Sequence, residues 1–447
     1  MPSNTRQNCY IDHNGSRFWL AKWLLPVESN PIEDGFVESR SGVIVNVGRY
    51  ADLDLDTQTL LTPLFEQAVH QNWLLTPGLI NAHTHLEQSV GKVAPSASKA
   101  PDMAAWLLEA KPILDKLNDP EVLETWLQRG ITETVACGTT FVNDISRNGK
   151  SLEALETAGL RAIVSLEFFH PDTHTLHETL LKTVVERYQK LQNQYRHHPR
   201  LRIGLSPHSP YNVSPNAWRW VLEKTGANQS AVLIHTHLAE SLAETAYLSG
   251  VPSQNGQQSI DAVHQAYVGK TFGASTPAQS PTQYLADHHL LCENLIAAHA
   301  VYTDAQDRSL LSRYGVCVVH CPRSNQYLQG ETLNWEAMRS ANIRMALGSD
   351  GHLSTPGLDL RAEGRIARIL HDLSASEVLA LLTQKAAELL QSEQTLGTLF
   401  AGKSADMALW RYQGHKSELS PEEQFLAAQT ECVASWVEGN PIFEADL

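Results

Sequence analysis

Residues 77–86 read PGLINAHTHL, a short apolar run that follows a Pro-Gly pair and ends in His83-Thr84-His85. Alternate side chains of an extended strand point to the same face. If this run is a strand, His83 and His85 present their imidazoles side by side, close enough to bind one metal ion. The competing interpretation is a pair of surface histidines at a strand end, because a chain with 20 histidines contains such pairs by chance.

The same run is the first of eight strand-like runs that alternate with helical patterns. The runs are Leu79–His85, Thr139–Asp144, Ala162–Phe168, Ile203–His208, Val232–His237, Leu295–His299, Val316–His320 and Met345–Asp350. Helical patterns between them include Glu121–Ala136, Ser151–Ala158, His177–Gln194 and Ala217–Lys224. This alternation predicts an α/β fold, a (β/α)8 TIM barrel with its active site at the carboxyl ends of the strands. An open doubly wound sheet is the alternative, but no glycine-rich dinucleotide loop follows the early strands.

Both ends of the chain carry short β-rich runs with turn residues between them. Phe18–Leu25 and Ser41–Gly48 show this pattern, so residues 15 to about 74 look all-β, and Leu396–Trp410 shows it near the other end. Residues 1–74 and 395–447 are therefore predicted to form one small, composite β-sandwich domain, and residues 75–394 to form the barrel.

Two segments of the predicted barrel lack a regular pattern. Lys92–Pro101 is rich in Ala, Ser and Pro, and Ser249–Thr282 is rich in Gln, Ser, Gly and Pro. Both follow predicted strands on the active-site face, so we interpret them as mobile loops rather than linkers. The first could cover the site, with Met103 and Trp106 as apolar lid residues; a plain surface loop is the equal alternative.

The composition fits a globular protein with a small-molecule partner. The 447 residues are 42% hydrophobic, and the formal net charge of −15 comes from acidic and basic residues spread along the chain. This charge argues against a nucleic-acid binder held by phosphate contacts. No apolar run is long enough to span a membrane, and Met1–Asn14 lacks the apolar core of a signal peptide. The six cysteines form no CxxC motif, which predicts reduced thiols and a cytoplasmic location.

Three later strand ends also carry residues suited to metal binding or catalysis. His235-Thr-His237-Leu-Ala-Glu240 ends the fifth run, His299 ends the sixth and Asp350 ends the eighth. In a barrel these ends meet at one mouth. Three neutral imidazoles and a carboxylate, with room for water, match a catalytic zinc-type site. Such a metal lowers the pKa of its water to about 7 and so provides hydroxide at neutral pH.

His235 and His237 alternate on one strand, and only one of them needs to bind metal. His237 precedes Glu240 by three residues, which places Glu240 at the mouth beside the metal water. His235 lies deeper, and a packed barrel histidine is the favoured interpretation. Glu240 could instead only begin the next helix, where a carboxylate favours the helix dipole.

Eight sequence segments, taken together, are specific for one protein superfamily. They are PGLINAHTHLE (77–87), SPHSPYNVS (206–214), HTHLAES (235–241), SPTQYLADHHLL (280–291), AAHAVYTD (297–304), HCPRSNQYL (320–328), LGSDG (347–351) and LGTLFAGKSADMALW (396–410). With them the sequence resembles the amidohydrolase superfamily over nearly its whole length. It resembles more narrowly the branch of mononuclear deaminases and chlorohydrolases that includes the methylthioadenosine/S-adenosylhomocysteine deaminases.

The resemblance implies a metal-ligand set. By motif position, His83, His85 and His237 bind one divalent ion, expected to be zinc with ferrous iron as the alternative. Asp350 is the fourth ligand or accepts a hydrogen bond from the metal water. Binuclear hydrolases of this fold bridge two metals with a carbamylated lysine on the fourth strand, and Arg202–His208 contains no lysine. A single metal ion is therefore expected.

The resemblance also implies roles in a hydrolytic deamination. Metal-bound hydroxide attacks the amine-bearing ring carbon of an aminated purine nucleoside or related N-heterocycle, and ammonia leaves. Glu240 shuttles a proton, His299 polarises the water or the substrate, and Asp350 passes a second proton to the amine. His208 is expected to touch the substrate ring.

Further substrate contacts are less specific. Trp106 is expected at the site as a lid residue, Glu87 contacts either substrate or a loop, and Arg323 in HCPRSN is a candidate anion contact. His320 and Asn325 are expected to shape the wall of the site.

Two other functions remain open from the sequence. One is an amidohydrolase or chlorohydrolase that uses the same site on a different leaving group, and the other is a non-catalytic binding protein on the same fold. The cytidine-deaminase type of zinc site is excluded because PCxxC is missing. A homodimer is the family-based expectation for assembly.

Overall fold

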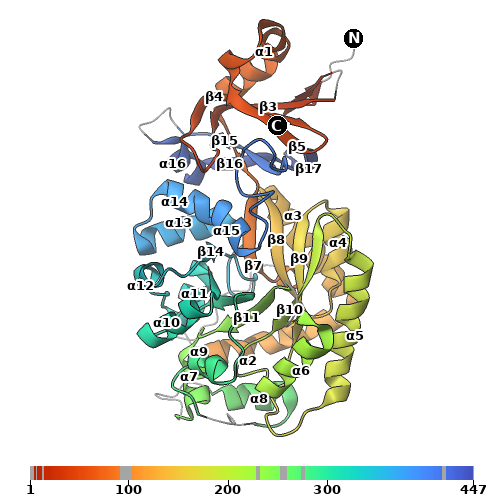
Figure 1. Cartoon of the computed structure of the whole chain (residues 1–447), viewed down its shortest axis with the longest axis vertical. Helices are drawn as coiled ribbons and strands as arrows, with labels where there is room; N and C mark the ends of the chain where they lie inside the picture. Colours follow the sequence, from red (N-terminus) through yellow and green to blue (C-terminus); the bar gives the residue numbers. More distant parts are fainter. Residues whose placement is uncertain are drawn as a thin grey trace.

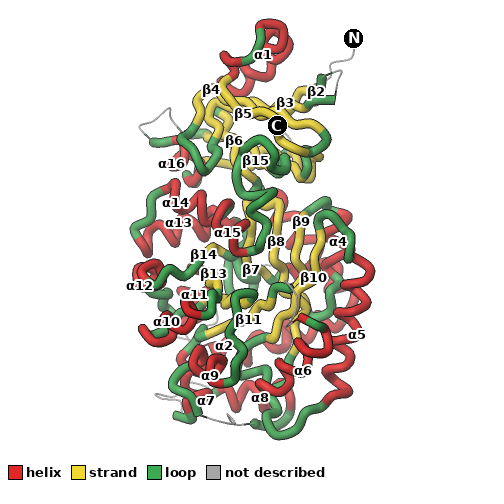
Figure 2. Tube along the Cα trace, in the orientation of Figure 1, coloured by secondary structure: helices red, strands yellow, loops and turns green. Residues whose placement is uncertain are grey.

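The computed structural model describes residues 5–6, 8–12, 15–90, 103–227, 232–251, 259–272, 277–414 and 419–445. Within them the chain forms two sheets. A parallel sheet holds the middle of the sequence, and a mixed sheet joins the two ends (Figure 1). Figure 2 shows the strands of the parallel sheet in the middle of the larger body, with helices around them.

The parallel sheet is the predicted barrel. Its eight strands lie in sequence order, each paired in parallel with the next. A parallel bridge between Thr84 and Asp350 joins the last strand region to the first, so the sheet nearly closes. The strands are β7 (Leu79–Thr84), β8 (Thr139–Ser146), β9 (Arg161–Phe168), β10 (Leu201–Pro207), β11 (Ile234–Leu238), β12 (Leu295–His299), β13 (Cys317–His320) and β14 (Met345–Leu347). The predicted fold class is confirmed.

Local signals explain where barrel helices begin. Ser214 accepts a hydrogen bond from Ala217 N, and Pro215 follows as a first helical residue, where its missing N–H costs nothing. The helices are α2 (Met103–Leu114), α3 (Pro120–Ala136), α4 (Ser151–Thr157), α5 (Glu178–Tyr195), α6 (Pro215–Thr225), α7 (Leu242–Ser249), α8 (Ile260–Val268), α9 (Pro281–Asp287), α10 (Ala305–Arg313), α11 (Pro322–Gln329), α12 (Trp335–Ser340), α13 (Leu360–His371), α14 (Ala375–Leu381) and α15 (Gln384–Leu389). The four predicted helices agree with α3 to α6 within two residues at each end. No described helix is both long and apolar enough to cross a membrane.

The mixed sheet draws strands from both ends of the chain. β6 pairs with β3 in parallel and with β15 antiparallel, so the C-terminal strands continue the N-terminal sheet. Trp19, Trp73 and Trp436 are buried in its core. The strands are β1 (Thr5–Arg6), β2 (Cys9–Ile11), β3 (Arg17–Leu24), β4 (Ile32–Arg40), β5 (Val43–Arg49), β6 (Trp73–Pro77), β15 (Met407–Tyr412), β16 (Thr430–Val437) and β17 (Asn440–Glu444). The joining of the two termini is confirmed; the residue limits of the two domains stay a prediction.

One part of the N-terminal prediction is wrong. Leu55–His70, expected within an all-β stretch, forms α1. Asp54 caps this helix by accepting a hydrogen bond from Thr57 N at 2.9 Å. The helix buries a narrow stripe at helical spacing, Leu61, Leu64 and Ala68. A short helix, α16 (Pro421–Leu426), also lies among the C-terminal strands.

The second predicted loop is more regular than expected. Within 249–282, α8 begins after Ser259, which accepts a hydrogen bond from Ala262 N, and ends at Gly269 with φ 80°. Its Tyr267 hydroxyl donates to Leu107 O at 2.7 Å, which ties α8 to α2. The predicted loop Lys92–Pro101 lies outside the described residues, as do 252–258 and 273–276.

Arg161, at the start of β9, is a buried ionic link between the two sheets. Its Nε donates to Asp406 Oδ2 at 2.6 Å, and the two side chains are 11% and 5% exposed. Arg161→Ala leaves this carboxylate buried without its partner, so we expect the free energy of unfolding to fall by about 3–5 kcal/mol in urea denaturation. Arg339→Ala, which removes an exposed pair with Glu336, is the control and should cost less than about 1 kcal/mol. Equal losses of unfolding free energy in Arg161→Ala and Arg339→Ala would contradict a stabilising role for the buried Arg161–Asp406 pair.

Candidate active site

The strand ends of the barrel bring five ionisable side chains to one buried point. His83 lies in β7 and His85 directly follows it, His237 lies in β11, His299 ends β12 and Asp350 follows β14. Nε2 of His83 and Nε2 of His85 each lie 3.5 Å from Asp350 Oδ1. The Nε2 atoms of His85 and His237 are 3.3 Å apart. His299 offers a ligand atom within 4.8 Å of those of His83 and His237. We call these five side chains the histidine–aspartate centre.

The spacing within this centre fits one small divalent ion. Ligand atoms placed 2.0–2.1 Å from a tetrahedral ion lie about 3.3 Å apart. Neither ring nitrogen of His83 has a hydrogen bond of normal geometry, although both are buried. Burial lowers the pKa of His83 to about 4, so its imidazole is neutral. Neutral imidazoles with a carboxylate are ligands that zinc and ferrous ions bind, so the residues fit a metal.

Hydrogen bonds on the outer side of two rings decide which nitrogen faces the centre. His237 Nδ1 donates to His208 O at 2.8 Å, and His299 Nδ1 donates to Asn325 Oδ1 at 2.8 Å. Each neutral ring then carries its lone pair on Nε2. Asn325 Nδ2 lies 3.1 Å from His320 Nδ1, so these two residues, expected in the wall of the site, support the ring of His299 from behind and do not line the cavity.

Asp350 is held by two hydroxyls and by a rare backbone conformation. Its Oδ2 accepts from Ser324 Oγ at 2.6 Å and from Ser354 Oγ at 2.7 Å. Its φ is 58° and that of His299 is 72°, and such conformations cost about 1–3 kcal/mol and persist only where the surroundings fix them. Burial alone would raise the pKa of Asp350, but the neighbouring imidazoles, His83 first, outweigh burial and hold that pKa well below its usual value.

Glu240 follows β11 and faces the same centre. Its Oε1 lies 3.6 Å from His299 Nε2. Burial raises the pKa of Glu240 to about 7, against the lowering effect of His237. A carboxyl group with this pKa can take up and return a proton near neutral pH. The start of α7 is capped by Ser241, whose Oγ accepts from Glu244 N at 3.1 Å, so the Glu240 carboxylate does not cap that helix.

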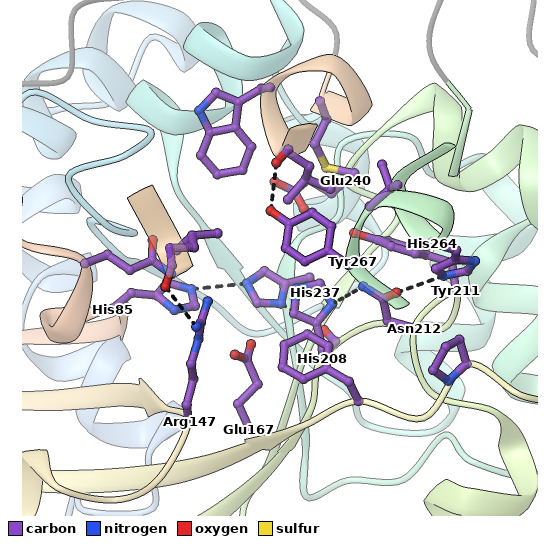
Figure 3. Close-up of a pocket in the computed structure, with 18 of the residues that line it drawn as sticks. His85, Arg147, Glu167, His208, Tyr211, Asn212, His237, Glu240, His264 and Tyr267 are labelled. Carbon is purple, nitrogen blue, oxygen red and sulfur yellow. Dashed lines mark hydrogen bonds between the residues drawn. The ribbon is translucent and has the colours of Figure 1, made fainter. Parts of the chain in front are cut away.

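The centre opens into a cavity of about 460 Å³, a size that suits a small organic ligand (Figure 3). His85, His237, Glu240 and Asp350 line part of its wall. Side chains of α2 and α8 supply much of the apolar lining, namely Met103, Trp106, Leu107, Val263, Tyr267 and Val268. Polar lining comes from Asp115, Arg147, Glu167, His208, Tyr211, Asn212 and His264.

Two of the four predicted substrate contacts lie on this wall. His208 follows β10 and lines the cavity. Trp106 also lines it, and its Nε1 donates to Leu353 O at 3.2 Å, which anchors α2 over the site. Both side chains can therefore reach a molecule in the cavity, and their contact with a substrate stays a prediction.

The other two predicted contacts are not among the lining residues. Glu87 is buried behind the wall, with Oε1 3.6 Å from Arg147 Nε. Arg323 lies with Nη1 3.4 Å from Glu363 Oε1. In both cases an oppositely charged protein group, rather than the cavity, faces the side chain.

His235 and Asn143 lie together in the barrel interior. Asn143 Nδ2 lies 2.8 Å from His235 Nδ1, and the His235 ring stacks on that of His83 with centroids 4.7 Å apart. Asp144, on the next position of β8, accepts from Leu86 N at 2.9 Å. These contacts are those of a packed barrel core.

The sequence analysis missed Arg147 and Glu167, which the structure places on the cavity wall. Arg147 directly follows β8, and Glu167 is the next-to-last residue of β9. A signal was present, because both lie at the carboxyl end of a predicted barrel strand. His264, also missed, reaches the wall from α8, inside a segment expected to be irregular.

Residues 74–442 match the model of the amidohydrolase family. The chain belongs to the amidohydrolase family. It is therefore a hydrolase of carbon–nitrogen bonds from a metal-dependent family, as the resemblance predicted. The buried histidine–aspartate centre is where this amidohydrolase can hold a metal ion.

Relatives of this amidohydrolase include two proteins named 5-methylthioadenosine/S-adenosylhomocysteine deaminase. The protein from Teredinibacter turnerae is 30% identical over 400 residues, which cover 87% of this chain and 82% of that one. The protein from Bacillus cytotoxicus is 28% identical over 372 residues, which cover 79% and 76%. Hydrolytic deamination is thus represented among its sequence relatives.

Solved structures share the fold of this amidohydrolase. An adenosine deaminase from Xanthomonas campestris with bound zinc has a TM-score of 0.74 at 24% identity, over 95% of this chain and 92% of that one. Helicobacter pylori aminofutalosine deaminase in complex with methylthio-coformycin scores 0.75 at 22% identity, over 95% and 100%. Atrazine chlorohydrolase from Arthrobacter aurescens TC1, complexed with zinc, scores 0.72 at 21%, over 95% and 94%.

The hydroxyl of Ser324 gives a test of the centre. Ser324→Ala removes a 2.6 Å hydrogen bond that orients Asp350, so we expect metal affinity to fall about 10–100-fold in chelator competition. Ser340→Ala removes an exposed hydroxyl at the end of α12, outside the histidine–aspartate centre and the cavity lining, and serves as the control. Unchanged affinity in Ser324→Ala would show that Asp350 needs no such support.

Proposed function

We propose that this protein is a metal-dependent hydrolytic deaminase of an aminated purine nucleoside or a related N-heterocycle. The observation that carries the proposal is the position of Glu240, a buried carboxyl group 3.6 Å from His299 Nε2 that also lines the cavity. This position puts one acid–base group within reach of both the histidine–aspartate centre and a ring in the cavity. The names of the sequence relatives support the choice of an aminated purine nucleoside.

His83, His85, His237 and Asp350 hold the metal ion in this proposal. The ion is zinc, with ferrous iron as the alternative. When bound, it supplies hydroxide near neutral pH by lowering the pKa of water. His237 donates a hydrogen bond through Nδ1, so its Nε2 keeps a lone pair that can bind the metal ion.

Glu240 moves the first proton. It accepts a proton from the attacking water and delivers it to the ring nitrogen beside the amine-bearing carbon, a role typically worth about 10²–10⁴-fold in rate. Its pKa of about 7 suits both the uptake and the release. His299 orients the water by accepting a hydrogen bond at Nε2, because Nδ1 is bound to Asn325.

Asp350 moves the second proton. Its Oδ2 is bound by Ser324 and Ser354, so Oδ1 is the oxygen that faces the histidines and the reacting water. Asp350 takes the proton that remains on the added oxygen and passes it to the departing amine, so that both protons of the water are accounted for. One substrate and one water give one ammonia and one ring that carries oxygen in place of the amine.

The cavity residues hold the ring. His208 and Trp106 contact the substrate, because both line the cavity. Glu87 positions Arg147 from behind the wall, at 3.6 Å from its Nε, and does not itself touch the substrate. Arg323 faces Glu363, which is not among the lining residues, so Arg323 takes no part in holding the ring.

Ammonia release tests the proposal. Protein of measured zinc content is incubated with adenosine and its 5′-substituted analogues, guanine, cytosine and other aminated heterocycles. We expect ammonia from the adenine nucleosides. Full metal occupancy without ammonia from any aminated ring would overturn the proposal, and amide or chlorinated heterocycles would then test the alternative leaving groups.

Two substitutions separate metal binding from proton transfer. His237→Ala removes a ligand, so both the metal and the activity should be lost. Glu240→Gln keeps the shape of the side chain but not its acid–base function, so metal should stay at one ion per chain while kcat falls about 100-fold or more. Elemental analysis and steady-state kinetics on the same samples check both. Metal retained in His237→Ala, or a near-normal kcat in Glu240→Gln, would contradict the assigned roles.

A further inference from the structure

Glu167 lines the cavity, yet the proposed reaction gives it no role. It is the next-to-last residue of β9 and is 9% exposed. Within the described part of the chain, no hydrogen bond or ion pair to a protein group engages its carboxylate. Arg147, on the same wall, is engaged elsewhere, with Nε 3.6 Å from Glu87 Oε1 and Nη1 3.4 Å from Leu114 O.

A carboxylate in this position needs hydrogen-bond donors from outside the protein. Removing a charged group from water without a partner is costly, so buried charges in proteins are paired. Burial raises the pKa of Glu167 to about 7, more than the nearby charge of Arg147 lowers that pKa. The open direction for a partner is the cavity, whose wall includes this side chain.

His208 beside it presents a donor. Asn212 Nδ2 donates to His208 Nδ1 at 3.0 Å, and Asn212 Oδ1 accepts from His264 Nε2 at 3.0 Å (Figure 3). Because Nδ1 of His208 accepts, the hydrogen of the neutral ring is on Nε2. No described residue takes a hydrogen bond from that nitrogen. His208 therefore offers an N–H to whatever fills the cavity.

The donor and the acceptor lie next to each other and next to the histidine–aspartate centre. A carboxylate oxygen of Glu167 and one ring nitrogen from each of His208 and His237 all lie within 4.8 Å of one another. A ligand that fits this wall carries a hydrogen-bond acceptor that faces His208 and, beside it, a donor that faces Glu167. In an aminated heterocycle the acceptor is a ring nitrogen.

We infer that Glu167 accepts a hydrogen bond from an N–H or O–H group that flanks the ring nitrogen bound by His208, and that it selects substrates carrying this donor. The inference rests on the proposed function and names a specificity-determining residue for it. The donor can come from the heterocycle, as an amino group or ring N–H, or from a hydroxyl of an attached sugar. Both sources share the same chemistry toward the carboxylate.

The three atoms could also suggest a second cation site. The protonation of His208 opposes it, because an Nε2 that carries hydrogen has no lone pair for a metal. His237 Nε2 is already directed at His85, at 3.3 Å. Metal content is therefore part of the test.

Two variants and three pairs of analogues test the inference. Glu167→Leu removes the acceptor at similar size, and Glu167→Gln keeps one acceptor oxygen without charge. Adenosine against its 2′-deoxy and 3′-deoxy forms tests the sugar hydroxyls, and 2-aminoadenosine against adenosine tests a ring amino group. Glu186→Gln, on the exposed face of α5, is the control.

The expected result is a loss of discrimination. Wild-type protein should prefer the donor-bearing member of one pair by about 10–100-fold in kcat/KM, the range for a hydrogen bond to a charged group. Glu167→Gln should reduce this ratio and Glu167→Leu should bring it close to one, with metal still at one ion per chain. An equal loss for every analogue, or loss of metal, would overturn the inference.

Failure of the inference and failure of the proposed function give different results. A wild-type protein that deaminates with no preference within any of the three pairs, or whose preference persists in Glu167→Leu, refutes only the role of Glu167. A wild-type protein that releases no ammonia refutes the proposed function. In that case calorimetric titration of the metal-loaded variants with the same analogues still decides whether Glu167 binds the donor.

Discussion

Burial of several imidazoles around one carboxylate is the constraint on which this structure depends. Asp350 lies 3.5 Å from Nε2 of both His83 and His85, at a depth where water does not screen charge. Desolvation keeps the imidazoles neutral, so they offer lone pairs rather than positive charge. The carboxylate and the imidazole lone pairs that face this point are all acceptors, so they cannot hydrogen-bond to one another. A shared cation satisfies all of them at once. The chemistry of the family follows from that preference.

The rest of the barrel holds this unfavourable arrangement in place. Parallel strands direct their carboxyl ends to one mouth, and the bridge between Thr84 and Asp350 joins the first strand to the eighth there. Left-handed backbone at His299 and Asp350 turns the chain sharply as it leaves the sheet. Outside the centre, Asn325 and the hydroxyl of Ser324 fix one ring and one carboxylate oxygen. Strain and desolvation are tolerated because a large packed core surrounds them.

The cavity shows a division between reaction and selection. The reacting groups sit at strand ends, which are rigid, while α2 and α8 bring an apolar cover from two distant segments and are joined by the hydrogen bond from Tyr267 to Leu107 O. Glu167 and His208 lie at strand ends as well, and both line the cavity. The fold itself hosts both deaminases and chlorohydrolases among its solved neighbours.

The sequence by itself determined the barrel and the residues of its centre, because strand and helix periodicity are local and these residues stand at the ends of predicted strands, with His83 and His85 on the same one. His83, His85, His237 and Asp350 could be named for that reason. It did not determine which other polar residues share the cavity, because that depends on side-chain direction and on partners far along the chain. Glu87 and Glu167 both end or follow barrel strands, yet Arg147 faces the first and only the second lines the cavity. Tertiary structure decided between them, because it places Arg147 against the carboxylate of Glu87 and the cavity against that of Glu167.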